Sequence, residues 1–242
     1  MKCLSMTLSG KTAHFKRPDV NANVYFTYQH IPKVALLGLF GAVIGLKGYS
    51  EQGKAIYPEF YDKLKNLEVS VVPLSGNNGI FSKKIQVFNN SVGYASQEVG
   101  NNLIIREQWL ENVSWRIYIN LDSDVESEIL DRLAQYLIEG KSVYLPYLGK
   151  NDHFADIGDT QIEDLEMTDT PEYVDSLYPC SVVELEDETQ NYDLPFTFKD
   201  TMPVGINEHG MYLFDKIGYT NRLVLKSEGT FYKAGEQILY FM

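Results

Sequence analysis

The chain has 242 residues, 44% of them hydrophobic and 13% aromatic, which is enough for one large domain or for a domain with an appendage. It has a formal net charge of −12 and only two cysteines, without a CxxC motif, which excludes a disulfide framework. Since no apolar run reaches the roughly 18 residues that a membrane span needs, we expect a cytoplasmic protein that does not bind a membrane.

The positive charge is concentrated in the N-terminal part of the sequence. Residues 1–90 contain 11 lysines and arginines against five acids, a net charge of +6, so the remaining residues carry −18. Residues 152–200 hold 15 acids and a single base, Lys199. Charge asymmetry of this kind bears on binding partners rather than on fold. It predicts a polyanionic ligand, with RNA as the first candidate, for the basic part and solvent or a basic protein for the acidic part.

The first predicted elements are a strand, a loop and a helix. Alternating apolar residues predict a strand over residues 2–12, and a loop follows over residues 15–31. A helix is expected to begin at Pro32, since proline is tolerated in the first helical turn. Three glycines of this helix are spaced to lie on one face: Gly38, Gly41 and Gly45. Glycine is unfavourable inside a helix, so this face is expected to allow another backbone to approach it closely.

The next elements follow from period-2 patterns and helix signals. In chain order the first are a strand at residues 68–72 and a hairpin over residues 81–92, with its tip near Asn89 and Asn90. Residues 103–109 predict the partner strand of this hairpin or a further strand, and a strand follows at residues 114–121. The last two are a helix from the S-x-x-E capping box of Ser123 and Glu126 to Gly140 and a strand at residues 143–145.

This order predicts an α+β fold of the ferredoxin-like class. A strand, a helix, two strands, a helix and a strand make the βαββαβ topology, here with an inserted β-hairpin at about residues 80–96. We expect this domain to occupy residues 1–151. For residues 152–242 we expect an acidic loop region and a small C-terminal β appendage. The strands of this appendage are predicted at residues 204–206, 211–217, 222–225, 230–233 and 237–241.

Four segments together resemble the CRISPR-associated protein 5 family. They are Gly-x-x-Ala-His-Phe with a basic pair at residues 10–17, Pro-x-x-Ala-Leu-Leu-Gly-Leu-x-Gly-Ala at residues 32–42, Arg-Glu-Gln-Trp-Leu at residues 106–110 and Tyr-Leu-Gly-Lys-Asn at residues 147–151. The resemblance covers roughly residues 1–160 and favours the subtype I-B branch. Members of this family are RAMP-type subunits of the Cascade surveillance complex.

The resemblance implies a noncatalytic RNA-binding subunit that acts in prokaryotic antiviral defence. Such a subunit binds the 5′ handle of the CRISPR RNA (crRNA) and needs no cofactor or metal. Its implied neighbours are the backbone subunit, CRISPR-associated protein 7, and the large subunit, CRISPR-associated protein 8, with target DNA close to the complex. The inserted hairpin is then the thumb, which packs against the guide near the handle.

Basic side chains neutralise phosphates, and aromatic rings stack on unpaired bases. The candidate RNA-binding residues are Lys11, His14, Lys16, Arg17, Tyr28, Lys33, Lys83 and Lys84, and no residue is assigned a catalytic role. The strand at residues 114–121 lacks the aromatic pattern of RRM-type sheets. We therefore expect loops, the first helix and the hairpin to hold the RNA.

Two other functions remain open. Relatives of subtype I-C cut precursor crRNA without metal, using a tyrosine, a lysine and an adjacent histidine. None of the four histidines, His14, His30, His153 and His209, follows a lysine, so the chain departs from that pattern, and His14 is the first candidate if cleavage occurs. The second is a protein-interaction module unrelated to RNA. A metal site of Asp152, His153, Asp156 and Asp159 is less expected than an exposed acidic loop.

Overall fold

A computed structural model of the chain describes residues 1–19, 23–94, 97, 99, 100, 102–186 and 194–242. Its helices are α1 (Lys33–Ile44), the short 3-10 helix η1 (Tyr49–Glu51), α2 (Glu59–Leu64) and α3 (Ser127–Ile138). Its strands are β1 (Lys2–Ala13), β2 (Val69–Pro73), β3 (Ser82–Asn89), β4 (Ile104–Asn120), β5 (Asp156–Asp164), β6 (Glu166–Thr168), β7 (Tyr178–Pro179), β8 (Val183–Leu185), β9 (Thr197–Ile206), β10 (Tyr212–Thr220), β11 (Val224–Ser227), β12 (Phe231–Ala234) and β13 (Gln237–Tyr240). The predicted mixture of helices and mostly antiparallel sheets is confirmed.

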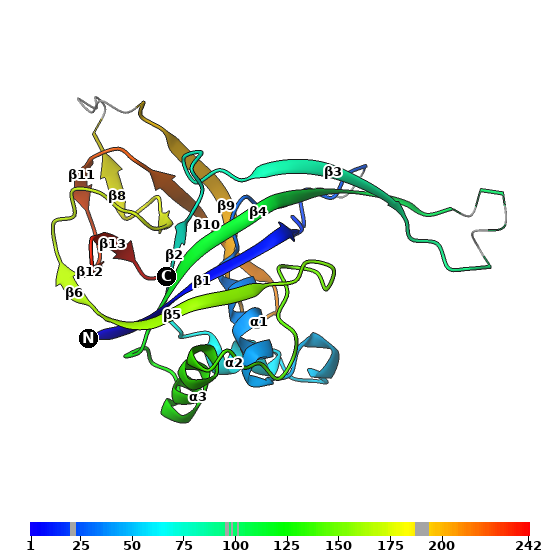
Figure 1. The fold of residues 1–242 in the computed structure, drawn as a ribbon, viewed down its shortest axis with the longest axis horizontal. Helices are drawn as coiled ribbons and strands as arrows, with labels where there is room; N and C mark the ends of the chain where they lie inside the picture. Colours follow the sequence, from blue (N-terminus) through cyan, green and yellow to red (C-terminus); the bar gives the residue numbers. More distant parts are fainter. Residues whose placement is uncertain (20–22, 95–96, 98, 101, 187–193) are drawn as a thin grey trace.

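The main sheet has five strands, and its helices lie together on one side of it (Figure 1). Four strands follow the order β2-β4-β1-β5, and β3 pairs with the outer half of β4. All of these pairings are antiparallel. The connection from β1 to β2 contains α1 and α2 and passes over β4, which lies between these two strands in the sheet. The connection from β4 to β5 contains α3 and passes over β1 in the same way.

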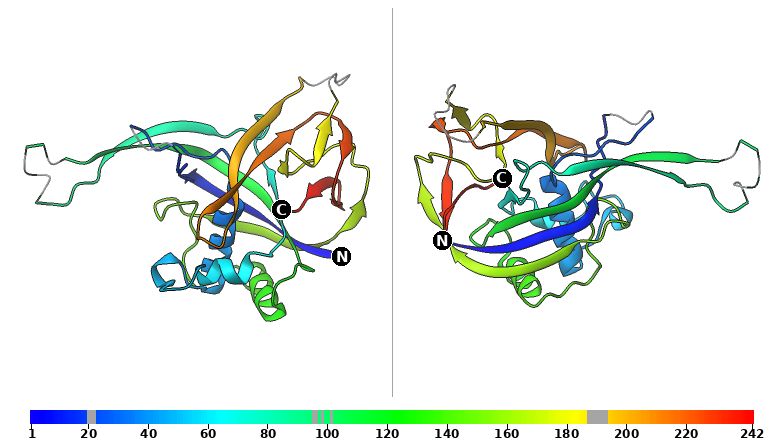
Figure 2. Two further views of the ribbon diagram at one scale, coloured as in Figure 1. Left: turned by 180° about the vertical axis from the view of Figure 1, so that it is seen from behind. Right: turned by 45° about the horizontal axis from the view of Figure 1, so that its top comes forward.

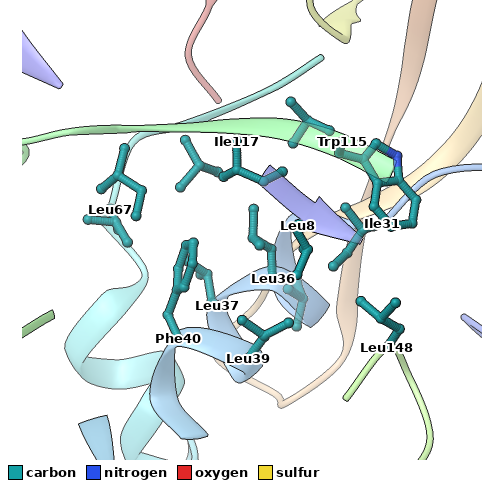
Figure 3. Packing of buried hydrophobic residues seen from close by; sticks show 14 of the residues in the cluster. Leu8, Ile31, Leu36, Leu37, Leu39, Phe40, Leu67, Trp115, Ile117 and Leu148 are labelled. Atoms are coloured by element: carbon teal, nitrogen blue, oxygen red, sulfur yellow. The ribbon is translucent and has the colours of Figure 1, made fainter. Parts of the chain in front are cut away.

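The core lies between this sheet and α1. Leu8 of β1 is opposite Trp115 of β4, and both are fully buried against the helix (Figure 3). Alternate side chains of a strand point to the same face, which is why the apolar positions of β1 line this core. Phe40 of α1 is also fully buried. At the start of β1 the opposite face is covered as well, because Cys3 packs with Leu239 of β13.

Two glycines of α1 make room for a side chain of α2, where the sequence predicted the approach of another backbone. A Cβ at Gly41 would lie 2.5 Å from the Cβ of Phe60, and a Cβ at Gly38 would touch the ring of Phe60. The close neighbour is therefore a side chain of α2. Gly45 does not share this face, because it caps the helix in the left-handed conformation, with φ 77°. Pro32 is the N-cap residue and precedes the first turn.

Replacement of Gly41 by alanine is expected to lower the free energy of unfolding by about 1–3 kcal/mol, because the added methyl overpacks the contact with Phe60. Urea unfolding measures the change. Gly48→Ala is the control, since φ is −94° and no atom lies within 4 Å of the added Cβ. An exposed helix position would instead gain about 1 kcal/mol from the same change, so stabilisation by Gly41→Ala contradicts the packing.

The capping box predicted for the second helix is wrong. Ser123 lies outside α3, and Glu126 is the N-cap residue without a side-chain cap. The hydroxyl of Ser123 instead donates to the main-chain oxygen of Asn120 and accepts from the N–H of Glu68. The Ser123 hydroxyl therefore makes a tertiary contact with the residue before β2, and it does not cap the helix as the local sequence predicted. The helix ends at Ile138, and Gly140, the predicted stop, follows the C-cap residue Glu139 with φ 62°.

The strand predicted at residues 143–145 is also wrong. The N–H groups of Val143 and Tyr144 donate to main-chain oxygens of Val43 and Ala42, so this segment caps the end of α1. The final strand of the main sheet is β5, which lies in the stretch that was predicted to be an acidic loop. The sheet therefore extends to Asp164, beyond the domain boundary that the sequence placed at residue 151.

A long hairpin of β3 and β4 projects from the body of the protein (Figures 1 and 2). Asn89 pairs with Ile104, so Asn89 and Asn90 are not at its tip. The range predicted for the insertion, about residues 80–96, contains only the outgoing strand, and residues 95 and 96 lie outside the described residues. The return strand is the outer part of β4, which continues unbroken into the main sheet.

The C-terminal strands form three smaller sheets that pack on the main domain (Figure 1). The strands predicted there are confirmed as β9 to β13. Met202 and Ile206 of β9 join the main core, and the hydroxyl of Tyr61 accepts the N–H of Ile206 at 2.6 Å. Within the described residues, no helix is long and apolar enough to cross a membrane.

Candidate nucleic-acid interface

A groove of about 700 Å³ follows one face of α1. Ala35, Gly38, Leu39 and Ala42 line it, and of these Ala35, Gly38 and Ala42 have little or no side chain to cover the helix backbone. Nearly every residue of α1 is apolar, and a helix that is apolar on all sides is normally covered on all sides. This face is an exception, because Ala35, Gly38 and Ala42 are only half-buried. The groove is therefore a candidate binding site.

Four exposed tyrosines from three separate segments line the groove. Their exposed fractions lie between 43% and 54%: Tyr49 after α1, Tyr144 and Tyr147 after α3, and Tyr212 in β10. Sequence reasoning missed all four as binding residues. The available signal was the pair of tyrosines on either side of Pro146, but Tyr144 was assigned to a strand. Exposed aromatic rings of this kind are suitable partners for unpaired bases.

Three of the predicted residues, His14, Lys16 and Tyr28, line one end of this groove. The loop that carries them is held closed by hydrogen bonds between its two sides, including Tyr28 N–H to the main-chain oxygen of Phe15 at 3.0 Å. Lys16 is exposed, and its ammonium lies 3.7 Å from the centre of the Tyr25 ring. This end of the groove therefore presents a cation and an aromatic ring together.

Arg17 is already engaged within the protein. Its guanidinium donates to Asp200 of β9 at 2.8 Å and to Asp19, and it lies 5.0 Å from the centre of the Tyr28 ring. Tyr28 is only 2% exposed, and burial raises the pKa of its hydroxyl to about 12. Arg17 and Tyr28 therefore fix the loop against β9, and Tyr28 is a wall of the groove rather than a free stacking surface.

The two lysines of the hairpin root have different surroundings. Lys83 is near Arg17 and Asp200. Burial has the largest influence on the pKa of its amine and lowers it. Lys84 forms an ion pair with Glu111 at 3.0 Å and lies 5.9 Å from the centre of the Trp109 ring. The structure thus brings Lys83, Arg17 and Tyr28 together, whereas Lys84 belongs to a separate group of side chains.

Lys33 and Lys11 lie apart from the groove. The amine of Lys33 donates to the main-chain oxygen of Met242 at 2.8 Å, and burial lowers its pKa. Lys11 is exposed on β1, three positions after the core residue Leu8, so it is on the sheet face that points away from α1. These two residues do not meet the others, although both lie close to them in sequence.

His14 is a buried, neutral side chain at the boundary of the groove. It is 1% exposed, and its Nδ1 lies 2.9 Å from the main-chain oxygen of Gln108, which requires Nδ1 to donate. Burial lowers the pKa of this histidine. His153 contacts it ring to ring, bonds to the hydroxyl of Thr12 at 2.7 Å and has a pKa lowered to about 4 by burial.

The hypothesis of a metal site near His153 is not supported. His153 is 1% exposed and packs edge-on against Trp109, 4.6 Å between ring centres, rather than among the acids around it in sequence. In the part of the chain that the structure describes, no three histidine, cysteine, aspartate or glutamate side chains gather as a metal site. Asp156 and Asp159 instead belong to β5.

Glu107 and Lys150 join two of the segments that carried the family resemblance. Glu107 is buried in β4 and accepts the amine of Lys150 at 2.9 and 3.0 Å and the indole N–H of Trp109 at 2.9 Å. Burial by itself raises the pKa of Glu107, but the hydrogen bonds from Lys150 and Trp109 outweigh it and hold the pKa below its ordinary value. This ion pair fixes residues 147–151 to the root of the hairpin.

The comparisons with known proteins agree with this fold. No family model matches the sequence, and no curated protein matches it. The structure is similar to that of a CRISPR protein from Archaeoglobus fulgidus, 14% identical, with 99% of this chain and 98% of that chain covered and a TM-score of 0.52. A chain from a CRISPR RNA-guided surveillance complex is 12% identical, with 93% and 91% covered and a TM-score of 0.53.

At these identities the likeness concerns the fold. The chain therefore has the fold of CRISPR-associated proteins over nearly its whole length, including the C-terminal strands. The resemblance inferred from the sequence is confirmed at this level, that of CRISPR-associated proteins.

Proposed function

We propose that the protein is an RNA-binding subunit of a type I CRISPR surveillance complex, Cascade, that holds the 5′ handle of the crRNA without cutting it. In this proposal it is a RAMP-type member of the CRISPR-associated protein 5 family, of subtype I-B. The similarity in fold to a chain of a CRISPR RNA-guided surveillance complex supports the proposal, because it extends over 93% of this chain.

The arrangement of the main sheet supports the ferredoxin-like part of the proposal. The strand order β2-β4-β1-β5, with helices in the two connections that step over a strand, matches the order expected for a βαββαβ domain. The β3–β4 hairpin is inserted between the second and third strands of that domain. This is the place of the thumb in the chain order that the resemblance implies.

The observation that carries the proposal is the meeting of the groove and the hairpin root. Residue Tyr25 donates its N–H to Arg106 and accepts the N–H of Gln108, each at 2.9 Å, so the loop beside the groove runs along β4. Lys16 lies on the Tyr25 ring at this point, and Arg106 is exposed. A single strand of RNA that stacks on the groove's tyrosines then meets cations where it reaches the hairpin.

The hairpin also offers a surface for the proposed neighbouring subunits. Ile85, Val87 and Ile104 are each about half exposed, at 50%, 50% and 49%. Ile85 and Val87 alternate on one face of β3, and such a face on a projecting element is typical of a contact with another molecule. We propose the backbone subunit, CRISPR-associated protein 7, as its partner, with CRISPR-associated protein 8 and target DNA at the same end of the complex.

The burial of the histidines supports a noncatalytic role. His30 is fully buried, and His14 and His153 are each 1% exposed. General acid–base cleavage of RNA needs a side chain within hydrogen-bond reach of the 2′-hydroxyl and the leaving oxygen. Burial lowers the pKa of all three histidines, so their neutral forms are favoured at pH 7. We propose that they hold the structure together and perform no chemistry on RNA.

Replacement of both Lys16 and Lys83 by glutamine is expected to lower the affinity for single-stranded RNA about 25-fold at about 0.1 M salt. The reason is that each phosphate contact contributes roughly 0.7 to the slope of log affinity against log salt. That slope is expected to become less steep by about 1.4. The probe is an RNA with the 5′ handle of the protein's own crRNA, incubated in EDTA and scored for retention and for cleavage.

The matched control replaces two surface lysines that are ion-paired elsewhere, Lys141 and Lys226. It removes the same charge and is expected to leave both affinity and slope unchanged. Equal losses in the two double variants indicate a nonspecific charge effect and contradict the proposed interface. Cleavage of the RNA in EDTA contradicts the noncatalytic role and favours the processing nuclease. Absence of salt-sensitive binding favours an interaction module unrelated to RNA.

A further inference from the structure

A second cavity, of about 210 Å³, lies among the C-terminal strands. Its lining residues come from β7 and the residue after it, from β8, from β9 and from the turn between β10 and β11. The residues that line it are Tyr178, Cys180, Val183, Leu185, Lys199 and Arg222. It shares no lining residue with the groove on α1, so it is a separate site that the proposed function does not use.

The charged groups that line this cavity are both cations. Lys199 is the single base among the 15 acids of residues 152–200, and it is placed at this cavity. Its sequence neighbour Asp200 is engaged by Arg17 at 2.8 Å, and among the described residues no carboxylate pairs with Lys199. Arg222 donates to the main-chain oxygen of Glu186, which is a neutral acceptor. The positive charge at the cavity therefore remains available to an anion.

A buried hydroxyl provides an independent sign of a missing ligand. Tyr178 is 1% exposed, and its hydroxyl has no hydrogen-bond partner in the described part of the chain. Leaving a buried polar group unsatisfied costs about 1–3 kcal/mol. The ring packs closely on Gly218 of the paired strand, where a side chain's Cβ would lie only 3.1 Å from it. An acceptor in the cavity relieves this cost.

We propose that this cavity binds a phosphate group, as inorganic phosphate or as the monoester of a small molecule. Phosphate oxygens accept hydrogen bonds from ammonium, guanidinium and hydroxyl groups, which are the donors present here. The volume is below the roughly 300 Å³ at which pockets for whole drug-sized ligands begin, so the cavity suits the phosphate group alone. Near the thiol of Cys180, Lys216 adds positive charge and Asp215 negative charge.

Inorganic phosphate is expected to bind the full-length protein and to raise its melting temperature above that in chloride at the same ionic strength. Calorimetric titration measures the affinity directly. Tyr178→Phe removes only the hydroxyl, so it is expected to weaken phosphate binding about tenfold while leaving the stability in chloride unchanged or higher. Lys199→Gln is expected to weaken binding as well, and Lys226→Gln, which removes a lysine that is paired with Glu228, is the matched control.

The titration is repeated with 5′-AMP and with acetate. Binding of 5′-AMP more tightly than phosphate identifies a nucleotide monoester as the source of the phosphate group, and the reverse order identifies free phosphate. Acetate as effective as phosphate overturns the proposal, because a carboxylate then suffices. Wild-type affinity in both Tyr178→Phe and Lys199→Gln also overturns it. RNA binding at the groove is unaffected in these variants, so the two proposals fail separately.

Discussion

Acidification from pH 7 to pH 4 is expected to cost the protein about 3 kcal/mol of unfolding free energy at each of two buried histidines. The pKa of His30 is lowered to about 3, with burial as the main cause and Lys83 adding to it. Burial lowers the pKa of His153 to about 4. The unfolded chain titrates near 6.5, so it binds more protons than the folded chain throughout this range.

The sign follows from that difference in protons bound. A histidine with a depressed folded pKa stabilises the fold fully at pH values above its unfolded pKa, and this contribution is lost as the pH falls below about 6.5. His14, whose pKa burial also lowers, adds to the loss in the same direction. Urea unfolding at a series of pH values measures the slope.

Two variants separate this effect from the protonation of carboxylates. His30 lies against Phe198, 5.0 Å between ring centres, and accepts from the indole of Trp115. His30→Gln keeps an acceptor but does not titrate, so it is expected to reduce the stability lost between pH 7 and pH 4 by about 3 kcal/mol. His209 is exposed, and His209→Gln is the control for the substitution itself. An unchanged pH dependence in His30→Gln contradicts the prediction.

Replacement of Gly149 by alanine is expected to lower the free energy of unfolding by about 3 kcal/mol or more. Gly149 has φ 90°, and a Cβ there would overlap the main-chain oxygen of His14. The main chain of residues 147–154 is held at this spot, because His14 N–H donates to Leu148 at 3.1 Å and Leu148 N–H donates to His153 at 2.7 Å. The strain is therefore not relieved by a small shift.

Gly158→Ala is the control for this substitution. Gly158 lies in β5, its φ is not positive, and no atom lies within 4 Å of the added Cβ. It is expected to leave stability unchanged or to raise it slightly. Because residues 147–151 also border the groove, Gly149→Ala is expected to weaken RNA binding together with stability. A stable Gly149→Ala protein contradicts the close approach to His14.

Much of the fold follows from local patterns in the sequence. The alternation in β1 and in the inner part of β4 predicted both strands, because burial of one strand face leaves a period of two. The glycine spacing of α1 predicted a close neighbour on that face, although the neighbour is the side chain of Phe60 rather than another backbone. The short C-terminal strands were predicted in the same way. These features depend on each segment's own residues and need no knowledge of what lies opposite.

The wrong predictions concern residues whose polar groups bond to a segment far away in the sequence instead of to their own helix or strand. Ser123 bonds to Glu68 instead of capping a helix, and Val143 caps α1 instead of entering the sheet. The acidic composition of residues 152–164 concealed β5, whose edge position in the sheet tolerates charged side chains.

The sequence by itself determined the α+β class, the basic N-terminal part, the projecting hairpin and the resemblance to CRISPR-associated proteins. Only the tertiary structure decided which of the candidate residues meet. It joined Arg17 to Asp200 and Glu107 to Lys150, and it gathered four tyrosines from separate segments around α1. The physical reason is that side-chain periodicity records whether a face is buried, whereas the partner across that face is set by strand pairing and helix packing between residues far apart in the chain.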